Sequence, residues 1–250
     1  MLTIGIIGGG GTEHLPFLTK TEAISLSTPF GEPSDLIHLG QFQGVRVAFL
    51  SRHGGHYRLL AHQVNYRANI HALHQLGVDA IIALATVGGI TVPAYSLVVP
   101  HQLIDYTYGR AQSFEGLEGM FQHIDFTVPF DGNLRQQIIQ AAVKSHQAII
   151  TEGVYAVTNG PRLETAAEIQ KLKQDGADIV GMTVMPEAAL ARELSIPYAV
   201  ISPVVNYAAG IAASEREIDF SQVGQSMSKM ADQTAAILQQ LISTMAINTK

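Results

Sequence analysis

The sequence predicts a single α/β domain with a mixed or mostly parallel central sheet flanked by helices. Short runs rich in Ile and Val alternate with amphipathic helical patterns along the 250 residues. Several of these runs are apolar at consecutive positions, which is typical of strands covered on both faces. Neither an internal repeat nor a linker interrupts the alternation. We therefore expect one domain over residues 1–250, with an ordered core from about residue 3 to residue 243.

The pattern assigns each element in chain order. Helical spacing is clearest in Val64–Leu76, which is followed by Gly77, a common residue just after a helix end. Two long polar stretches, Tyr108–Asp125 and Ala208–Ile218, predict loops. The predicted strands are Ile4–Ile7, Val45–Leu50, Ala80–Ala85, Ser96–Pro100, Gly153–Val157, Ile179–Met182 and Ala199–Ser202. The predicted helices are Val64–Leu76, Thr165–Asp175, Pro186–Leu194 and Ser221–Ile242.

Composition excludes several classes of function. The chain has no cysteine, which excludes disulfides, zinc–thiolate sites, iron–sulfur clusters and cysteine nucleophiles. Its 15 Lys and Arg residues do not cluster and the net charge is −6, so we expect neither nucleic acid nor a membrane as partner. The N-terminus lacks the features of a signal peptide and no apolar stretch could span a bilayer, so we expect a cytoplasmic protein. Because only 14% of residues are charged, part of the surface is expected to be covered in an oligomer.

Two motifs directly follow predicted strands. Gly8–Gly11 offers converging backbone N–H groups that would bind an anion, although a tight turn would explain the glycines equally well. The run matches neither a dinucleotide-binding fingerprint nor a P-loop. Arg52 and His53 follow Val45–Leu50, where their charge-assisted donors would bind an oxyanion such as phosphate. The alternative is an ordinary polar pair at the end of a strand.

Other polar positions have plain structural interpretations beside the functional ones. The two His-x-x-His pairs, at 53–56 and 71–74, lack the Glu of the zinc protease motif, so no metal site is expected. Thr165 has the position of a helix cap. Residues 181–187 would connect a strand to a helix, and Asn206 would be a turn residue.

Taken together and in this order, the motifs resemble the trimeric purine nucleoside phosphorylase family, with the 5′-methylthioadenosine phosphorylases as the closest branch. The resemblance extends from Ile4 to about Leu241. It implies a phosphorylase fold, a homotrimer with sites at subunit interfaces, and reversible phosphorolysis of a purine nucleoside. Inorganic phosphate would be the co-substrate, with no metal or organic cofactor. The motifs that carry the resemblance are Gly8–Gly11, Ser51–Gly54, Val64–Ile70, Gly160–Thr165 and Gly181–Glu187.

The resemblance also implies roles for individual residues, among which Asn206 and His53 would be catalytic. Inorganic phosphate would lie at Gly10, Arg52, His53, Thr86 and Thr183. The nucleoside would contact Met182 at the ribose, Leu163, Glu164, Asn206 and Ala208 at the base, and His123 of a neighbouring subunit near the sugar 5′ position.

Three base positions indicate a 6-oxopurine. The adenine-specific branch has Asp at positions 206 and 208 and a small hydroxyl residue at 164, whereas this chain has Asn206, Ala208 and Glu164. The Glu164 carboxylate can accept from the N1–H of a 6-oxopurine, and Asn206 can donate to O6 and accept from a protonated N7. Adenine presents the inverse pattern at N1 and at its 6-amino group. Such a mismatch of buried polar groups discriminates strongly between substrates.

The sugar end indicates a different group from that of ordinary nucleosides. Related enzymes that act on inosine use a His for the 5′-hydroxyl, and residues 217–223 contain none. Ile218, Phe220 and Val223 would instead form an apolar wall for a 5′-methylthio group, or would simply begin the core face of the last helix. The expected substrate is therefore S-methyl-5′-thioinosine, as in bacterial phosphorylases of that nucleoside. The alternatives are a general inosine/guanosine phosphorylase, a methylthioadenosine phosphorylase, and a nucleoside-binding module without turnover.

Overall fold

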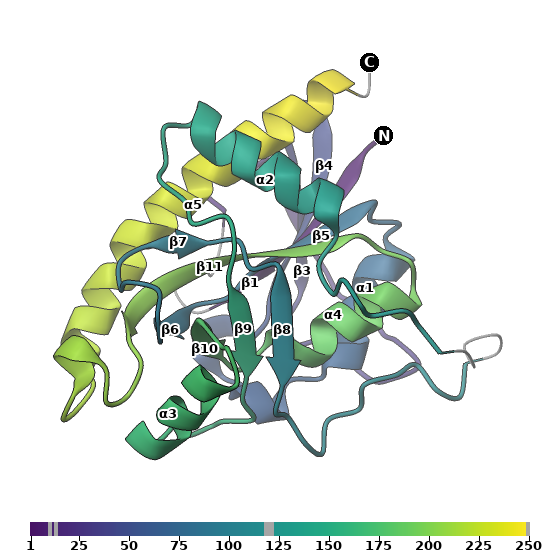
Figure 1. Ribbon diagram of the computed structural model, residues 1–250. Coiled ribbons are helices and arrows are strands. Elements are labelled where there is room, and N and C mark those ends of the chain that lie inside the picture. Colours follow the sequence, from purple (N-terminus) through teal and green to yellow (C-terminus); the bar gives the residue numbers. More distant parts are fainter. Residues whose placement is uncertain (10–11, 13–14, 118–122, 249–250) are drawn as a thin grey trace.

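A mixed sheet forms the centre of the structure, a computed structural model that describes residues 1–9, 12, 15–117 and 123–248 (Figure 1). Within these residues the strand order is β2-β3-β4-β1-β5-β11-β6-β10-β9-β8, and β7 pairs with β11 outside this path. The strands are β1 Thr3–Gly8, β2 Thr19–Ile24, β3 Ile37–Phe42, β4 Val45–Ser51, β5 Ala80–Leu84, β6 Val87–Gly89, β7 Leu97–Val98, β8 Gln102–Asp105, β9 Val154–Val157, β10 Ile179–Gly181 and β11 Tyr198–Tyr207. The helices are α1 Tyr66–Gln75, α2 Gly132–Lys144, α3 Ala166–Gln174, α4 Val184–Glu193 and α5 Phe220–Asn248, with the 3-10 turns η1 Gly55–Tyr57, η2 Ala61–Gln63 and η3 Ala212–Ser214.

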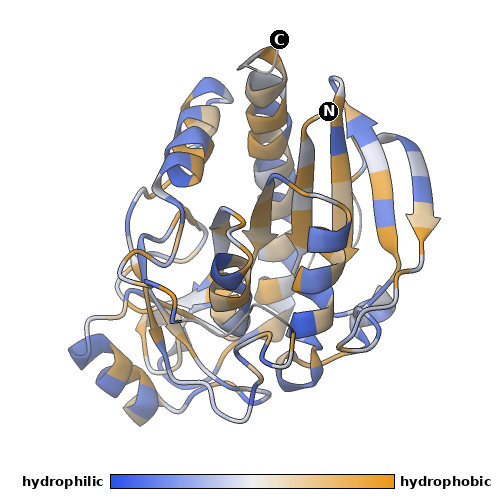
Figure 2. Ribbon diagram, turned by 90° about the vertical axis from the view of Figure 1, so that its right-hand side faces the viewer, coloured by the Kyte–Doolittle hydropathy of each residue, from blue (hydrophilic) through white to orange (hydrophobic). Residues whose placement is uncertain are grey.

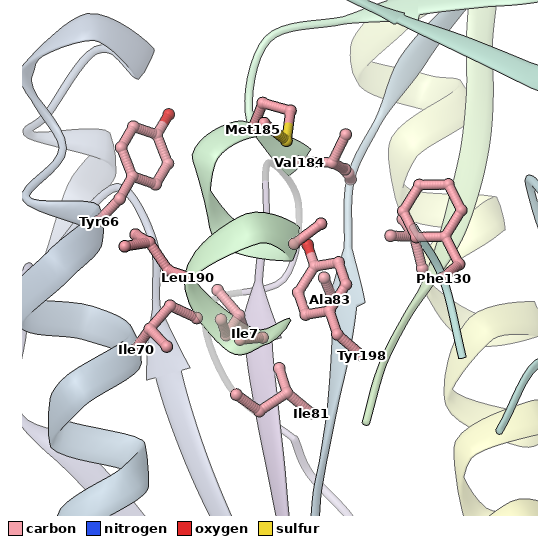
Figure 3. Close-up of a cluster of buried hydrophobic side chains, with 14 of the residues drawn as sticks. Ile7, Tyr66, Ile70, Ile81, Ala83, Phe130, Val184, Met185, Leu190 and Tyr198 are labelled. Atoms are coloured by element: carbon pink, nitrogen blue, oxygen red, sulfur yellow. The ribbon is translucent and has the colours of Figure 1, made fainter. Parts of the chain in front are cut away.

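The central strand β1 explains how the sheet is covered on both faces. All six of its residues are buried, and it pairs in parallel with β4 and β5. Ile4 and Ile6 belong to the core beneath α2 and α5, whereas Ile7 belongs to the core beneath α1 and α4. Figure 3 shows this second core, where Ile70 of α1 and Leu190 of α4 lie next to Ile7. A strand buried on both faces has to be apolar at consecutive positions.

Hydropathy changes from the centre of the sheet to its edge. In Figure 2 the central strands are mostly hydrophobic, whereas the strands at the outer edge carry hydrophilic and hydrophobic residues in alternation. The edge strand β2, with the sequence TKTEAI, is exposed along nearly its whole length. Its partner β3 is partly buried. Polar residues of this kind protect a sheet edge from pairing with another chain.

The structure confirms the predicted fold class and most predicted elements. Each of the seven predicted strands and four predicted helices is present, although Ser96–Pro100 contributes only the two-residue strand β7. Strands β2, β3, β6 and β8 and helix α2 were not predicted. Strand β11 continues to Tyr207, past the predicted end at Ser202, because Pro203 lies opposite Leu97 of the short strand β7 and a bulge follows at Val204–Asn206. Among the described residues no helix is long and apolar enough to cross a membrane.

The sheet reverses direction between β6 and β10, and this reversal positions the site. β4, β1, β5 and β11 run in parallel, and β6 runs parallel to β11. β10 pairs antiparallel with β6 and runs parallel to β9. The carboxyl ends of β4 and β5 are thereby brought to the same region as the carboxyl end of β10, where the chain leaves the sheet. Ligands of α/β sheets bind at such strand ends.

Candidate active site

A cavity of about 300 Å³ lies at these strand ends, a volume suited to a small ligand. Its polar residues come from the chain just after β4, β5 and β10, from β11, and from the loop before α3. Its apolar wall comes from residues at and before the start of α5. Twelve of the predicted site residues line this cavity: Arg52, His53, Thr86, Leu163, Glu164, Met182, Thr183, Asn206, Ala208, Ile218, Phe220 and Val223.

The other two predicted site residues, Gly10 and His123, are not placed at the cavity by the structure. Gly10 lies outside the described residues. His123 is exposed and is not among the lining residues of its own chain. The resemblance assigned His123 to a neighbouring subunit's site, so that assignment stays a prediction.

Arg52 is fully buried and forms an ion pair with Glu187 in α4. Nε lies 2.5 Å from Oε1 and Nη2 lies 3.0 Å from Oε2, while Nη1 donates to the carbonyl oxygen of Leu84 at 2.8 Å. The hydroxyl of Tyr198 donates to Oε2 of Glu187 at 2.8 Å. Burial alone would lower the pKa of Arg52, but the charge and hydrogen bonds of Glu187 raise that pKa above its ordinary value. Arg52 is therefore a fixed, permanently charged donor at the wall of the cavity.

The sequence predicted that His53 would be a charged hydrogen-bond donor, but its surroundings favour a neutral ring. Its Nδ1 lies 2.8 Å from the carbonyl oxygen of Leu59, and its ring stacks on Tyr57 with centroids 4.2 Å apart. Burial, and secondly the charge of Arg52, lower the pKa of His53 to about 4. The imidazole is consequently neutral near pH 7, so the expectation of a charge-assisted donor does not hold for this side chain.

The predicted base-contact positions line the same cavity. Glu164 accepts a hydrogen bond on Oε1 from the hydroxyl of Thr158 at 2.6 Å. The side-chain nitrogen of Asn206 donates to the carbonyl oxygen of Tyr207 at 2.6 Å. Each side chain keeps hydrogen-bonding capacity for a ligand, because a carboxylate has a second oxygen and an amide has a second N–H and an oxygen. Ala208 is buried and adds only a methyl group.

The apolar end is formed by the segment that leads into α5. Ile218, Phe220 and Val223 line the cavity together with Met227 one turn further along the helix. Phe220, the first residue of α5, lines the cavity although most of its side chain is exposed. Thr183 precedes α4, makes no capping hydrogen bond with its side chain, and lines the cavity.

Three residues that shape the site were not assigned a role from the sequence: Glu187, Thr158 and Met227. Glu187 had a detectable signal, because a single acid within the apolar run VMPEAALA needs a buried cation as partner. Thr158 and Met227 had no comparable signal, because a threonine after a strand and a methionine on a helix face are ordinary structural residues. Among the described residues no group of three or more His, Asp or Glu could hold a metal ion.

Comparisons with known proteins agree with this geometry. Residues 3–243 match the Phosphorylase superfamily. A probable S-methyl-5′-thioinosine phosphorylase of Pseudomonas syringae is 46% identical, covering 97% of this chain and 99% of its own. A 6-oxopurine nucleoside phosphorylase of Pyrococcus furiosus is 39% identical, covering 95% and 91%. The solved structure of methylthioadenosine phosphorylase from Schistosoma mansoni in complex with adenine is similar with a TM-score of 0.91 and 32% identity, covering 100% of this chain and 93% of that one. This protein therefore belongs to the phosphorylase superfamily.

Proposed function

We propose that the protein cleaves S-methyl-5′-thioinosine with inorganic phosphate to give hypoxanthine and 5-methylthioribose 1-phosphate. The observation that carries the proposal is a single cavity lined by three kinds of group: the guanidinium of Arg52, the polar side chains of Glu164 and Asn206, and apolar side chains before and within the first turns of α5. These groups suit an oxyanion, a 6-oxopurine and a methylthio group respectively. Relatives named "Probable S-methyl-5′-thioinosine phosphorylase", 46% and 42% identical over most of this chain, support the same reaction.

The reaction needs no covalent enzyme intermediate. The bond from C1′ to N9 breaks and its electron pair goes to the purine, while a phosphate oxygen forms the new bond to C1′. The departing base takes its proton from solvent, because neither Asn206 nor a neutral His53 supplies one. Arg52 and Thr183 would hold phosphate in line with C1′, and Asn206 would stabilise charge that builds up on the base.

The finer features of the proposal come from the sequence. We propose a homotrimer with His123 lent to the neighbouring site, a cytoplasmic location, and phosphate as co-substrate without a metal or organic cofactor.

A general inosine/guanosine phosphorylase is the main alternative. It would share the base and phosphate ends of the cavity and differ only in what the apolar wall accepts.

A substrate panel with phosphate present tests the proposal. S-methyl-5′-thioinosine should have the highest kcat/KM. S-methyl-5′-thioadenosine should be used roughly 10⁴-fold less well because of the polar mismatch at the base, and inosine about 10- to 200-fold less well because an apolar pocket discriminates less. Better use of S-methyl-5′-thioadenosine would exclude the base assignment. Inosine as the best substrate would favour the alternative enzyme, and base release without phosphate would exclude phosphorolysis altogether.

A matched pair of variants isolates the apolar wall. Val223→Thr replaces a methyl group of the wall by a hydroxyl and nearly keeps the shape of the side chain. It should lower the preference for the methylthio nucleoside over inosine by several-fold, because the methylthio group would then meet a buried polar group. Val143→Thr makes the same exchange at an exposed position of α2 outside the cavity and should leave the preference unchanged.

A further inference from the structure

The charge at the oxyanion end of the cavity is already balanced within the protein. Glu187 accepts from Nε and Nη2 of Arg52, and Leu84 accepts from Nη1. A guanidinium has five N–H groups, so two remain for a ligand, one on each terminal nitrogen. The Arg52–Glu187 pair thus offers donors without offering net charge. Selection among oxyanions at this end depends on hydrogen-bond pattern more than on excess positive charge.

Whereas Arg52 offers hydrogen-bond donors to the cavity, His53 offers an acceptor. A carbonyl oxygen only accepts, so the hydrogen bond with Leu59 requires that Nδ1 carries the proton of the neutral ring. The other ring nitrogen, Nε2, makes no hydrogen bond with the described residues, and the side chain lines the cavity. In this tautomer Nε2 has a lone pair and no hydrogen. His53 therefore presents an acceptor to a ligand that Arg52 meets with donors.

The surroundings of His53 keep the ring in this state near neutral pH. Burial and the neighbouring charge of Arg52 hold its pKa near 4. Tyr57, which stacks on the ring from η1, is uncharged near neutral pH, because the ordinary pKa of a phenol is about 10 and partial burial raises the pKa of Tyr57 further. The carboxylate on α4, Glu187, is already bonded to Arg52. The remaining titratable groups around this ion pair are the phenols of Tyr66 in α1, Tyr155 in β9 and Tyr198 in β11, whose pKa values are all raised by burial.

We propose that His53 makes the site selective for tetrahedral oxyanions that carry a hydroxyl. Nε2 accepts the hydrogen bond of the P–OH group of phosphate, while Arg52 donates to the unprotonated oxygens. This rests on the proposed function, since it concerns the phosphate of that reaction. Sulfate has the same shape but carries no hydrogen near neutral pH, so one of its oxygens would face the lone pair of Nε2. Two opposed acceptors in a buried site lose a hydrogen bond and repel each other.

Equilibrium binding of phosphate, arsenate and sulfate to the full chain tests the proposal by calorimetry, without nucleoside. At about pH 7.5, phosphate and arsenate should bind alike and sulfate about 10²-fold more weakly or worse, because a site built for a hydroxyl rejects a ligand that lacks it. His53→Gln places an amide that can turn its N–H group toward the ligand, so the ratio between phosphate and sulfate should fall about tenfold. His62→Gln is the matched control, since His62 is exposed and does not line the cavity.

Monofluorophosphate provides a measurement on the unaltered protein in case His53→Gln does not fold. Fluorine replaces the hydroxyl in this ion, so it should bind as weakly as sulfate. Sulfate or monofluorophosphate binding within about threefold of phosphate would overturn the selectivity, and so would an unchanged ratio in folded His53→Gln. A protein that neither binds phosphate nor uses it in nucleoside cleavage would contradict the proposed function instead, so the two failures are distinguishable.

Discussion

At the residue scale, Glu187 balances the buried positive charge of Arg52, although the two residues are far apart in the sequence. The two side chains are fully buried, come from positions 135 residues apart, and share two hydrogen bonds. The hydroxyl of Tyr198 donates a further hydrogen bond to the Glu187 carboxylate. Removing one charge of a buried pair leaves the other without a partner in a medium of low dielectric constant, which costs far more than a surface pair contributes.

Glu187→Ala should lower the free energy of unfolding by about 3–5 kcal/mol, because Arg52 would remain buried and unpaired. The double variant Arg52→Met, Glu187→Leu removes both charges and should recover most of that loss. Urea unfolding at one fixed protein concentration measures both, since oligomerisation makes apparent stability depend on concentration. A loss below about 1 kcal/mol in Glu187→Ala would show that water or another group compensates the charge.

Thr158 acts on the base end through Glu164. Its hydroxyl donates to Oε1 of the carboxylate at 2.6 Å, which fixes the carboxylate's orientation and leaves Oε2 for N1–H of a 6-oxopurine. Thr158→Val should lower kcat/KM for the 6-oxopurine nucleoside about tenfold, the typical value of a hydrogen bond to a charged group, and Thr158→Ser should restore it. Hypoxanthine affinity, measured directly, should follow the same order. Equal loss in the Val and Ser variants would indicate a packing role instead.

The sequence predicted which residues gather at the site better than how they contact each other. Arg52 and residues 181–187 were both identified as motifs, and Arg52 lines the cavity together with Gly181, Met182 and Thr183. The ion pair between Arg52 and Glu187 and the tautomer of His53 were not foreseen, because they depend on contacts such as the Leu59 carbonyl that no local pattern encodes. Motifs placed at strand ends converge by topology, whereas protonation and pairing are set by tertiary burial.

At the element scale, the start of α3 shows how a cap holds a functional loop. Thr165 accepts from the backbone N–H of Glu168, and the Glu168 carboxylate accepts from the backbone N–H of Thr165. Glu168 also forms an exposed ion pair with Arg162, whose hydrogen bonds lower the pKa of Glu168 to about 2. The predicted structural role of Thr165 as a cap is therefore confirmed, and it directly follows Glu164.

Thr165→Ala should lower the free energy of unfolding by about 1 kcal/mol, the usual cost of losing a Ser or Thr cap, and Thr165→Ser should retain nearly all of it. Thermal and urea unfolding of the two variants measure the difference. If Ala is as stable as Ser, the reciprocal bond from Glu168 alone is enough to start the helix.

The sequence predicted the strands that are formed by buried apolar residues, but not those that depend mainly on pairing with a neighbouring strand. The strands β1, β4 and β5 are nearly continuous apolar runs, buried on both faces, and their bounds were close to those observed. Strand β2 is polar and exposed, so only its pairing with β3 makes it a strand. Helix α2 was missed although a signal was present, since Leu134, Ile138, Ala141 and Ala142 are buried on one face after the cap Asp131.

At the scale of the whole molecule, the surroundings of the cavity suggest that it is incomplete in one chain. Four large apolar residues of its lining are substantially exposed: Tyr57, Leu60, Leu163 and Phe220. Exposed apolar side chains grouped at one site are typical of a surface that another protein covers. His123 is a polar residue that the resemblance assigns to a neighbour's sugar site, and it does not line the cavity of its own chain. Both observations favour a site shared between subunits.

Mixed oligomers test this sharing directly. Arg52→Ala damages the site of its own chain, and His123→Ala damages the site to which that chain lends its loop. Each variant alone should be nearly inactive, but random mixing in a cyclic trimer joins an intact Arg52 with an intact neighbouring His123 in about a quarter of sites, so activity should recover to about that fraction of the wild-type value. Co-expression of the two chains followed by an assay with S-methyl-5′-thioinosine and phosphate measures the recovery. Asn206→Ala replaces Arg52→Ala if the unpaired Glu187 prevents folding. Activity that stays at the level of the separate variants would mean that each chain holds a complete site.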